Sequence, residues 1–81
     1  MGRPRDSEFR SLCREIGGKI KAARIRAGFT QEQMADEPYP MELRNYQRIE
    51  AGEQNITLAT IYKLAKKLGC KPENFFRRSR L

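Results

Sequence analysis

The segment formed by residues 30–52 limits most strongly what this chain can fold into. It starts with Thr30 and Gln33, the capping-box spacing in which a hydroxyl and an amide side chain satisfy each other's backbone N–H groups at a helix start. Two prolines then stand in the segment 36–41, and proline fixes its own φ and disfavours helix in the residue before it. A helical pattern resumes at Leu43. The segment therefore predicts two short helices joined by a stiff connection.

The second of these helices has two chemically different faces, because residues three and four apart lie on the same side of a helix. One face carries Tyr46, Ile49 and Glu50, and the opposite face carries Arg44, Gln47 and Arg48. The two arginines are four residues apart and repel each other, so a negatively charged partner would relieve them. Arginine can pair with guanine, and glutamine with adenine, in the major groove of DNA. A hydrated charged face is the commoner alternative, but the preceding helix and the net charge of +7 favour DNA here.

The segment 16–76, about three quarters of the chain, resembles the Cro and phage-repressor-like helix-turn-helix domains, also called the XRE family. The resemblance lies in a Gly-x-Thr-Gln-x-x-x-Ala motif followed by Ile-Glu-x-Gly. The matching residues are 16–21, Arg24, 28–35, 49–52 and 58–69. This resemblance implies an all-α, lambda-repressor-like DNA-binding domain built as a compact bundle of five helices. It also implies binding to operator DNA, usually as a dimer, to repress or activate transcription.

The resemblance assigns roles to individual residues. The base-reading positions of the family correspond to Leu43, Arg44, Gln47 and Arg48. The phosphate-contacting positions correspond to Thr30, Gln31, Asn45, Asn55 and Thr57. Leu43 could touch a thymine methyl group or could simply pack, and Thr57 also reads as a helix N-cap. Glu50 would form a partly buried ion pair with Arg24 of the first helix, which fixes how the two helices cross.

The turn between the paired helices departs from the family pattern, which usually has four residues with a glycine. In this chain the segment 36–41, which contains two prolines, stands at that place. Aligned with the family pattern, the turn is one residue longer. We expect the first helix of the pair to end near Asp36 or Glu37, because of the proline that follows. The exposed positions of the second helix are therefore matched to the family by counting back from Ile49 and Glu50 near its end.

The remaining sequence predicts further helices and two basic ends. Residues 1–6 form a flexible basic arm, 7–76 a single DNA-binding domain, and 77–81 a basic tail. The first helix begins near Asp6 or Ser7 and ends before Gly28. In its middle, Gly17 and Gly18 permit either close packing or a bend.

A helix that starts at Thr57 and ends at Gly69 has one apolar face. This face carries Leu58, Ile61, Leu64, Ala65 and Leu68. A short last helix begins at Pro72 and ends with Phe75 and Phe76. One of these two phenylalanines closes the core, and the other forms a dimer face with Tyr62 or Leu68.

Composition bounds the classes of function. A chain of 81 residues makes one domain, and 17 Lys and Arg against 10 Asp and Glu suit a polyanion such as DNA or an anionic membrane surface. No apolar run approaches the ~18 residues of a spanning helix, and no signal peptide is evident, so we expect a cytoplasmic protein with no membrane partner.

Histidine is absent from the sequence, which excludes a Cys2His2 zinc site and any Ser-His or Cys-His nucleophile pair. Cys13 lies on the apolar side of the first helix and reads as a core residue, with a redox switch as the alternative. We expect no enzyme activity, no metal, no cofactor and no small-molecule ligand.

These observations predict a sequence-specific DNA-binding transcriptional regulator, of repressor type, that reads the major groove of double-stranded DNA with the helix from Leu43. It would bind as a homodimer to a palindromic operator with half-sites about 34 Å apart. The small size and the segment 55–58 resemble the controller proteins of restriction-modification systems. The alternative is an antitoxin-like protein-interaction module that masks a partner protein.

Overall fold

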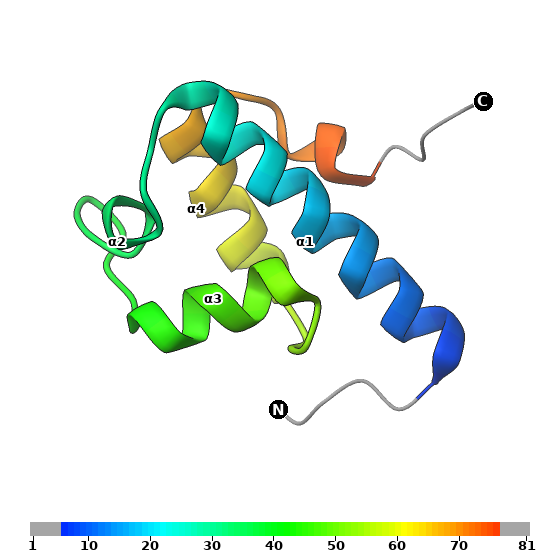
Figure 1. Cartoon of the computed structure of the whole chain (residues 1–81). Helices are drawn as coiled ribbons and strands as arrows, with labels where there is room; N and C mark the ends of the chain where they lie inside the picture. Colours follow the sequence, from blue (N-terminus) through cyan, green and yellow to red (C-terminus); the bar gives the residue numbers. More distant parts are fainter. Residues whose placement is uncertain (1–5, 77–81) are drawn as a thin grey trace.

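The computed structural model describes residues 6–76, so the basic arm up to residue 5 and the tail 77–81 lie outside the described residues. Within this range the chain forms four α-helices and one 3-10 helix, with no strand (Figure 1). The elements are α1 (Ser7–Ala27), α2 (Gln31–Met34), α3 (Leu43–Ala51), α4 (Leu58–Leu68) and η1 (Pro72–Phe76). The predicted all-α class is confirmed, and the expected fifth helix is the short 3-10 element.

The longest helix, α1, is the element on which the others assemble: α3, α4 and η1 all pack against it, and α2 packs against α3. In Figure 1 α1 runs the length of the molecule, with α2 and α3 together on one side. The backbones of α1 and α3 touch at Gly17, where an added Cβ would lie 2.3 Å from the carbonyl oxygen of Ile49. Gly17 therefore serves close packing rather than a bend, while a Cβ at Gly18 would meet nothing within 4 Å.

Side-chain caps fix where the helices begin. Asp6 caps α1, and its Oδ1 accepts hydrogen bonds from the N–H groups of Glu8 and Phe9. The predicted capping box is present at α2: the Gln33 N–H donates to Thr30 Oγ1 (3.1 Å) and the Thr30 N–H donates to Gln33 Oε1 (2.8 Å). Thr57 caps α4, as the sequence indicated.

The prediction that α2 ends near Asp36 or Glu37 is wrong, because α2 ends at Met34. The Glu37 N–H donates to the side-chain Oδ1 of Asp36 (2.8 Å) rather than to a helical carbonyl oxygen, so the helical hydrogen-bond pattern is already broken before Pro38. The end of α2 is held by α4: Lys67 Nζ donates to the carbonyl oxygens of Gln33 and Asp36. A tertiary contact therefore replaces the missing helical turn.

The core lies where α1, α3, α4 and η1 meet. Its buried side chains include Ile16, Ile20, Met34, Tyr46, Ile49, Ile61, Leu64, Ala65 and Phe75. Phe75 closes the core at 2% exposure, while Phe76 is 47% exposed. Leu58, which the sequence placed on the apolar face of α4, is 73% exposed, because the first turn of α4 reaches past the covered part of that face. Among residues 6–76, none of the helices combines the length and the apolar character that a membrane span requires.

Candidate nucleic-acid interface

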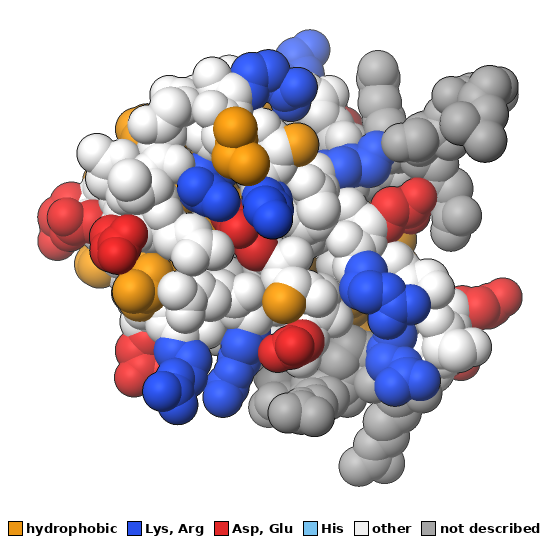
Figure 2. Space-filling model, viewed as in Figure 1, with side chains coloured by type: hydrophobic (Ala, Val, Ile, Leu, Met, Phe, Trp, Pro, Cys, Tyr) orange, Lys and Arg blue, Asp and Glu red, His pale blue; other side chains and the backbone are white. Residues whose placement is uncertain are grey.

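The helix α3 has an exposed basic face and a buried face. Arg44, Gln47 and Arg48 are exposed, whereas Tyr46, Ile49 and Glu50 are buried. Lys and Arg side chains project from the edge of the molecule where α3 lies, next to acidic ones (Figure 2). The split follows the 3.6-residue period of the helix, so the guanidinium groups point away from the core.

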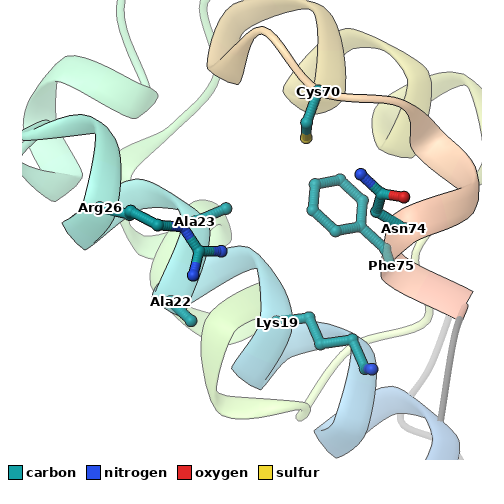
Figure 3. A pocket seen from close by; sticks show the side chains of 7 residues that line it. All are labelled: Lys19, Ala22, Ala23, Arg26, Cys70, Asn74 and Phe75. Atoms are coloured by element: carbon teal, nitrogen blue, oxygen red, sulfur yellow. The ribbon is translucent and has the colours of Figure 1, made fainter. Parts of the chain in front are cut away.

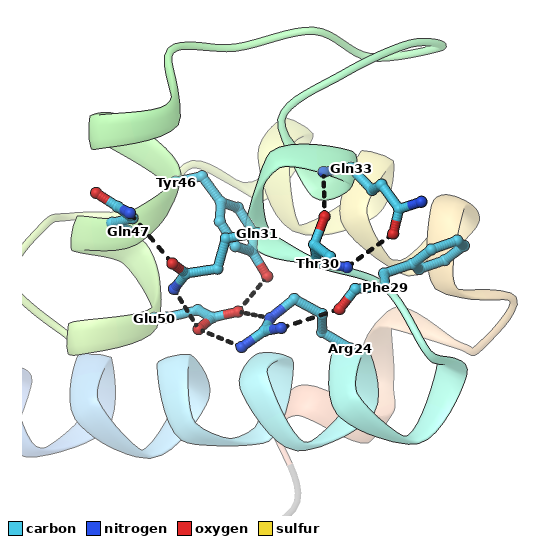
Figure 4. Close-up of polar contacts among 8 residues, drawn as sticks. All are labelled: Arg24, Phe29, Thr30, Gln31, Gln33, Tyr46, Gln47 and Glu50. Atoms are coloured by element: carbon cyan, nitrogen blue, oxygen red, sulfur yellow. Dashed lines mark hydrogen bonds and ion pairs between the residues drawn. The ribbon is translucent and has the colours of Figure 1, made fainter.

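The buried side of α3 is tied to α1 by an ion pair. Arg24 Nε donates to Glu50 Oε2 at 2.6 Å, and Arg24 Nη2 donates to Glu50 Oε1 at 3.3 Å (Figure 4). The third guanidinium nitrogen, Nη1, donates to the Phe29 carbonyl oxygen at 2.9 Å, just before α2 begins. One arginine therefore connects α1, α3 and the start of α2, which fixes the angle between the paired helices.

Tyr46 completes this cluster. Its hydroxyl donates to Glu50 Oε2 at 2.5 Å. Burial, helped by the neighbouring Glu50 carboxylate, raises the pKa of Tyr46 far above its ordinary value, so Tyr46 stays a neutral donor. Helical spacing predicted Tyr46 on the buried face but not its hydrogen bond, although a tyrosine four residues before a buried glutamate was a usable signal.

The pKa of Glu50 is lowered from its ordinary value. Burial alone would raise it, but the hydrogen bonds from Arg24, Tyr46 and Gln31 together outweigh burial. The pKa of Arg24 is raised, chiefly by its hydrogen bond to Glu50. Glu50 therefore remains an ionised acceptor for three different side chains.

Gln31 links this cluster to the outer face of α3. Its Nε2 donates to Glu50 Oε1 at 3.1 Å, and its Oε1 accepts from Gln47 Nε2 at 3.1 Å (Figure 4). Gln31 thus holds the side chain of Gln47 in place and keeps one amide hydrogen unused by these bonds. The Gln31–Gln47 bond joins a predicted phosphate-contacting residue to a predicted base-reading residue.

The other predicted DNA-contacting residues are spread around α3. Thr30 stands at the start of α2, while Asn55 and Thr57 lie in the connection from α3 to α4. Asn45 is half-buried, and its Oδ1 accepts a hydrogen bond from Gln54 Nε2, a partner that the sequence analysis missed. Leu43 is half-buried at the first position of α3.

Two comparisons with known proteins agree with this geometry. The helix-turn-helix family matches residues 43–75, which run from α3 into η1. This match and the structural likeness described next support a DNA-binding regulator that contains a helix-turn-helix domain of the XRE type. The structure of the chain is similar to that of the restriction-modification controller protein C.AhdI from Aeromonas hydrophila, at a TM-score of 0.73 and 27% identity over 82% of this chain and 97% of that chain. A search of curated protein sequences finds no match.

Proposed function

We propose that this protein is a sequence-specific transcriptional regulator that reads operator DNA in the major groove with α3, as a homodimer on a two-fold-related site. The observation that carries the proposal is the exposed face of Arg44, Gln47 and Arg48 on a helix that is fixed from behind by the Arg24–Glu50 ion pair. A rigid helix presents its side chains to base edges at a defined depth and angle. The likeness to C.AhdI supports the narrower proposal of a restriction-modification controller.

Three side chains of α3 are proposed to read bases. Arg44 and Arg48 can each donate two hydrogen bonds to guanine O6 and N7. Gln47 gives one amide hydrogen to Gln31, so its Oε1 and its second hydrogen can meet adenine N6 and N7. Leu43 is proposed to contact a thymine methyl group at the start of the same helix.

Phosphate contacts are proposed for the residues that flank α3 on both sides. These are Thr30, Gln31, Asn45, Asn55 and Thr57. Gln31 would use the amide hydrogen left over from its bond to Glu50. The net charge of +7 adds a sequence-independent attraction to the DNA backbone, which weakens as salt is added.

The proposed dimer uses an apolar face formed by Phe9, Ile56, Leu58, Tyr62 and Phe76. Leu58, Tyr62 and Phe76 are 73%, 52% and 47% exposed. A hollow of about 190 Å³ lies on this face, lined by Phe9, Ile56, Leu58 and Phe76 among others. Exposed apolar surface of this kind marks interaction sites on small proteins.

The size of the molecule suits a second copy on this face. Its longest extents are 32 and 31 Å, so two copies side by side have centres about one molecular width apart. Half-sites on B-DNA recur about every 34 Å, which matches that separation. The apolar face begins in the connection that follows α3, so a two-fold axis there would place the two copies of α3 on one side of the duplex.

The direct test is selection of bound DNA from a random library. A palindrome with half-site centres ten to eleven base pairs apart is expected, since this spacing matches one turn of the duplex. Enrichment of a single half-site would contradict the proposed dimer but would still support base recognition by α3. Failure to enrich any sequence would reject both.

A further inference from the structure

A second hollow, of about 220 Å³, opens between α1, the end of α4 and η1 (Figure 3). Lys19 and Arg26 line it from α1, and Cys70, Asn74 and Phe75 line it from the opposite side. The thiol of Cys70 and the ring of Phe75 point into the space between the walls (Figure 3). None of these residues belongs to the proposed DNA contacts or to the apolar face.

The hollow is positively charged. Lys19 and Arg26 are seven residues apart, which is two helical turns, so both lie on one side of α1 about 10 Å apart along its axis. No carboxylate lines the hollow, and within residues 6–76 neither cation has an ion-pair partner. Two such charges around a partly enclosed space raise the local concentration of anions. Asn74 adds an amide group that can donate to an oxygen of the anion.

The remaining lining is apolar and uncharged. Phe75 is buried, and two alanines of α1 complete the floor. Burial raises the pKa of the Cys70 thiol, while the charge of Arg26 opposes that rise. The thiol is therefore neutral near neutral pH and adds a soft, weakly polar surface. Two cations at the rim of an apolar floor fit a ligand with charged ends and a short hydrocarbon body.

We propose that this hollow binds a small organic dianion, such as a dicarboxylate, with one end on Lys19 and the other on Arg26. The volume lies below the ~300–1,000 Å³ of sites for drug-sized molecules, so the ligand is a small metabolite-sized compound. Asn74 binds it from η1, so that the ligand connects α1 to η1. Because η1 also carries Phe76 of the apolar face, occupancy of the hollow stiffens part of the dimer surface. That last consequence rests on the proposed function, whereas the binding itself does not.

The test uses Cys70 as a reporter in the full chain. In a Cys13→Ala variant Cys70 is the only thiol, and it is partly exposed, so iodoacetamide can reach it. Glutarate is added at constant ionic strength, and the rate of alkylation is followed. We expect saturable protection of several-fold. Glutaramide, which has a similar shape without charge, should give none. Equal protection by both compounds, or slowing that does not saturate, overturns the proposal.

Matched variants locate the site. Lys19→Gln and Arg26→Gln should each raise the half-saturating glutarate concentration about tenfold, since each removes a charged hydrogen bond. Lys21→Gln removes the same charge from an exposed position of α1 outside the hollow and should leave it unchanged. The chemical shift of the Asn74 side-chain amide gives a second readout that does not depend on thiol reactivity. An equal effect of Lys21→Gln overturns the proposal. No DNA is present, so failure here leaves the proposed function untouched.

Discussion

The two faces of α3 differ in how their polar groups are satisfied. On the buried face, Glu50 accepts hydrogen bonds from Arg24, Gln31 and Tyr46, and within residues 6–76 no buried side-chain nitrogen or oxygen lacks a partner. On the exposed face, Arg44 and Arg48 stand in solvent. The buried face is complete within the protein, whereas the exposed face is suited to an outside partner. The comparison predicts that changes on the first face reduce stability and changes on the second reduce DNA binding.

The largest expected effect is on the buried face, in Arg24→Met. This change leaves the Glu50 carboxylate, only 4% exposed, without its cation, and should lower the free energy of unfolding by about 3–5 kcal/mol. Urea unfolding measures the loss. In the triple variant Arg24→Met, Glu50→Leu and Tyr46→Phe, where neither a charge nor the buried Tyr46 hydroxyl is left without a partner, stability should return in large part. A triple variant as unstable as the single one would mean that the ion pair itself, rather than the stranded charge, supplies the stability.

The next effect tests the backbone contact beneath the same face. Gly17→Ala places a Cβ 2.3 Å from the Ile49 carbonyl oxygen, so α1 and α3 must separate, at a cost of about 1–3 kcal/mol. Gly18→Ala is the matched control, because its Cβ meets nothing and alanine favours helix by about 1 kcal/mol over glycine. Thermal unfolding should show opposite shifts of the midpoint. Equal shifts would contradict the close contact between the two helices.

The exposed face is tested by Arg44→Ala and Arg48→Ala. Each should cost about 1–3 kcal/mol of binding to the selected operator and relax preference at one base position. Stability should stay within about 0.5 kcal/mol of the parent, because surface substitutions rarely change it more. Lys63→Ala, an exposed charge on α4, controls for the general loss of positive charge. Unchanged sequence preference in both arginine variants would mean that α3 does not read bases.

Gln31→Ala sharpens the comparison, because Gln31 bridges the two faces. Loss of a phosphate contact should weaken binding to all DNA sequences by a similar factor. Loss of the bond that holds Gln47 should instead reduce preference for adenine at a single position. Affinities for the operator and for a single-base variant of it separate these two results. Equal affinity of Gln31→Ala and the parent for both DNAs would show that Gln31 contributes neither.

The sequence predicted those features that depend on local periodicity. The two faces of α3 follow from residue spacing, and the caps at Thr30 and Thr57 follow from short-range hydrogen bonds. Features that depend on neighbouring elements could not be predicted. At the end of α2, Lys67 from the distant helix α4 donates to the carbonyl oxygens of Gln33 and Asp36. The exposure of Leu58 likewise depends on how far the covering elements reach, because periodicity gives the direction of a side chain but not what covers it.

The candidate site shows the same limit. The Arg24–Glu50 pair was expected from the family resemblance, and the structure contains it. The bond that Gln31 makes to Glu50 was not expected, because it depends on the angle at which α2 and α3 cross. The bond from Tyr46 to Glu50 lies within α3, and its four-residue spacing could have predicted it. The exposure of Arg44, Gln47 and Arg48 followed from their spacing along the helix alone.

The smallest expected effect is the pH dependence that Glu50 gives to stability. Its pKa is lower in the folded chain than the ordinary value near 4.3, so it stabilises the fold above that value, and this stabilisation is lost as the pH falls through the folded pKa. The slope from this one group cannot exceed about 1.4 kcal/mol per pH unit. Urea unfolding from pH 7 to pH 3 should therefore show the advantage of the parent over Glu50→Gln shrinking at acidic pH. All other carboxyl groups are common to both chains and cancel in the difference. A difference in unfolding free energy between the two chains that stays constant with pH would mean that Glu50 titrates alike in the folded and unfolded states. Its three hydrogen bonds would then not favour the ionised form.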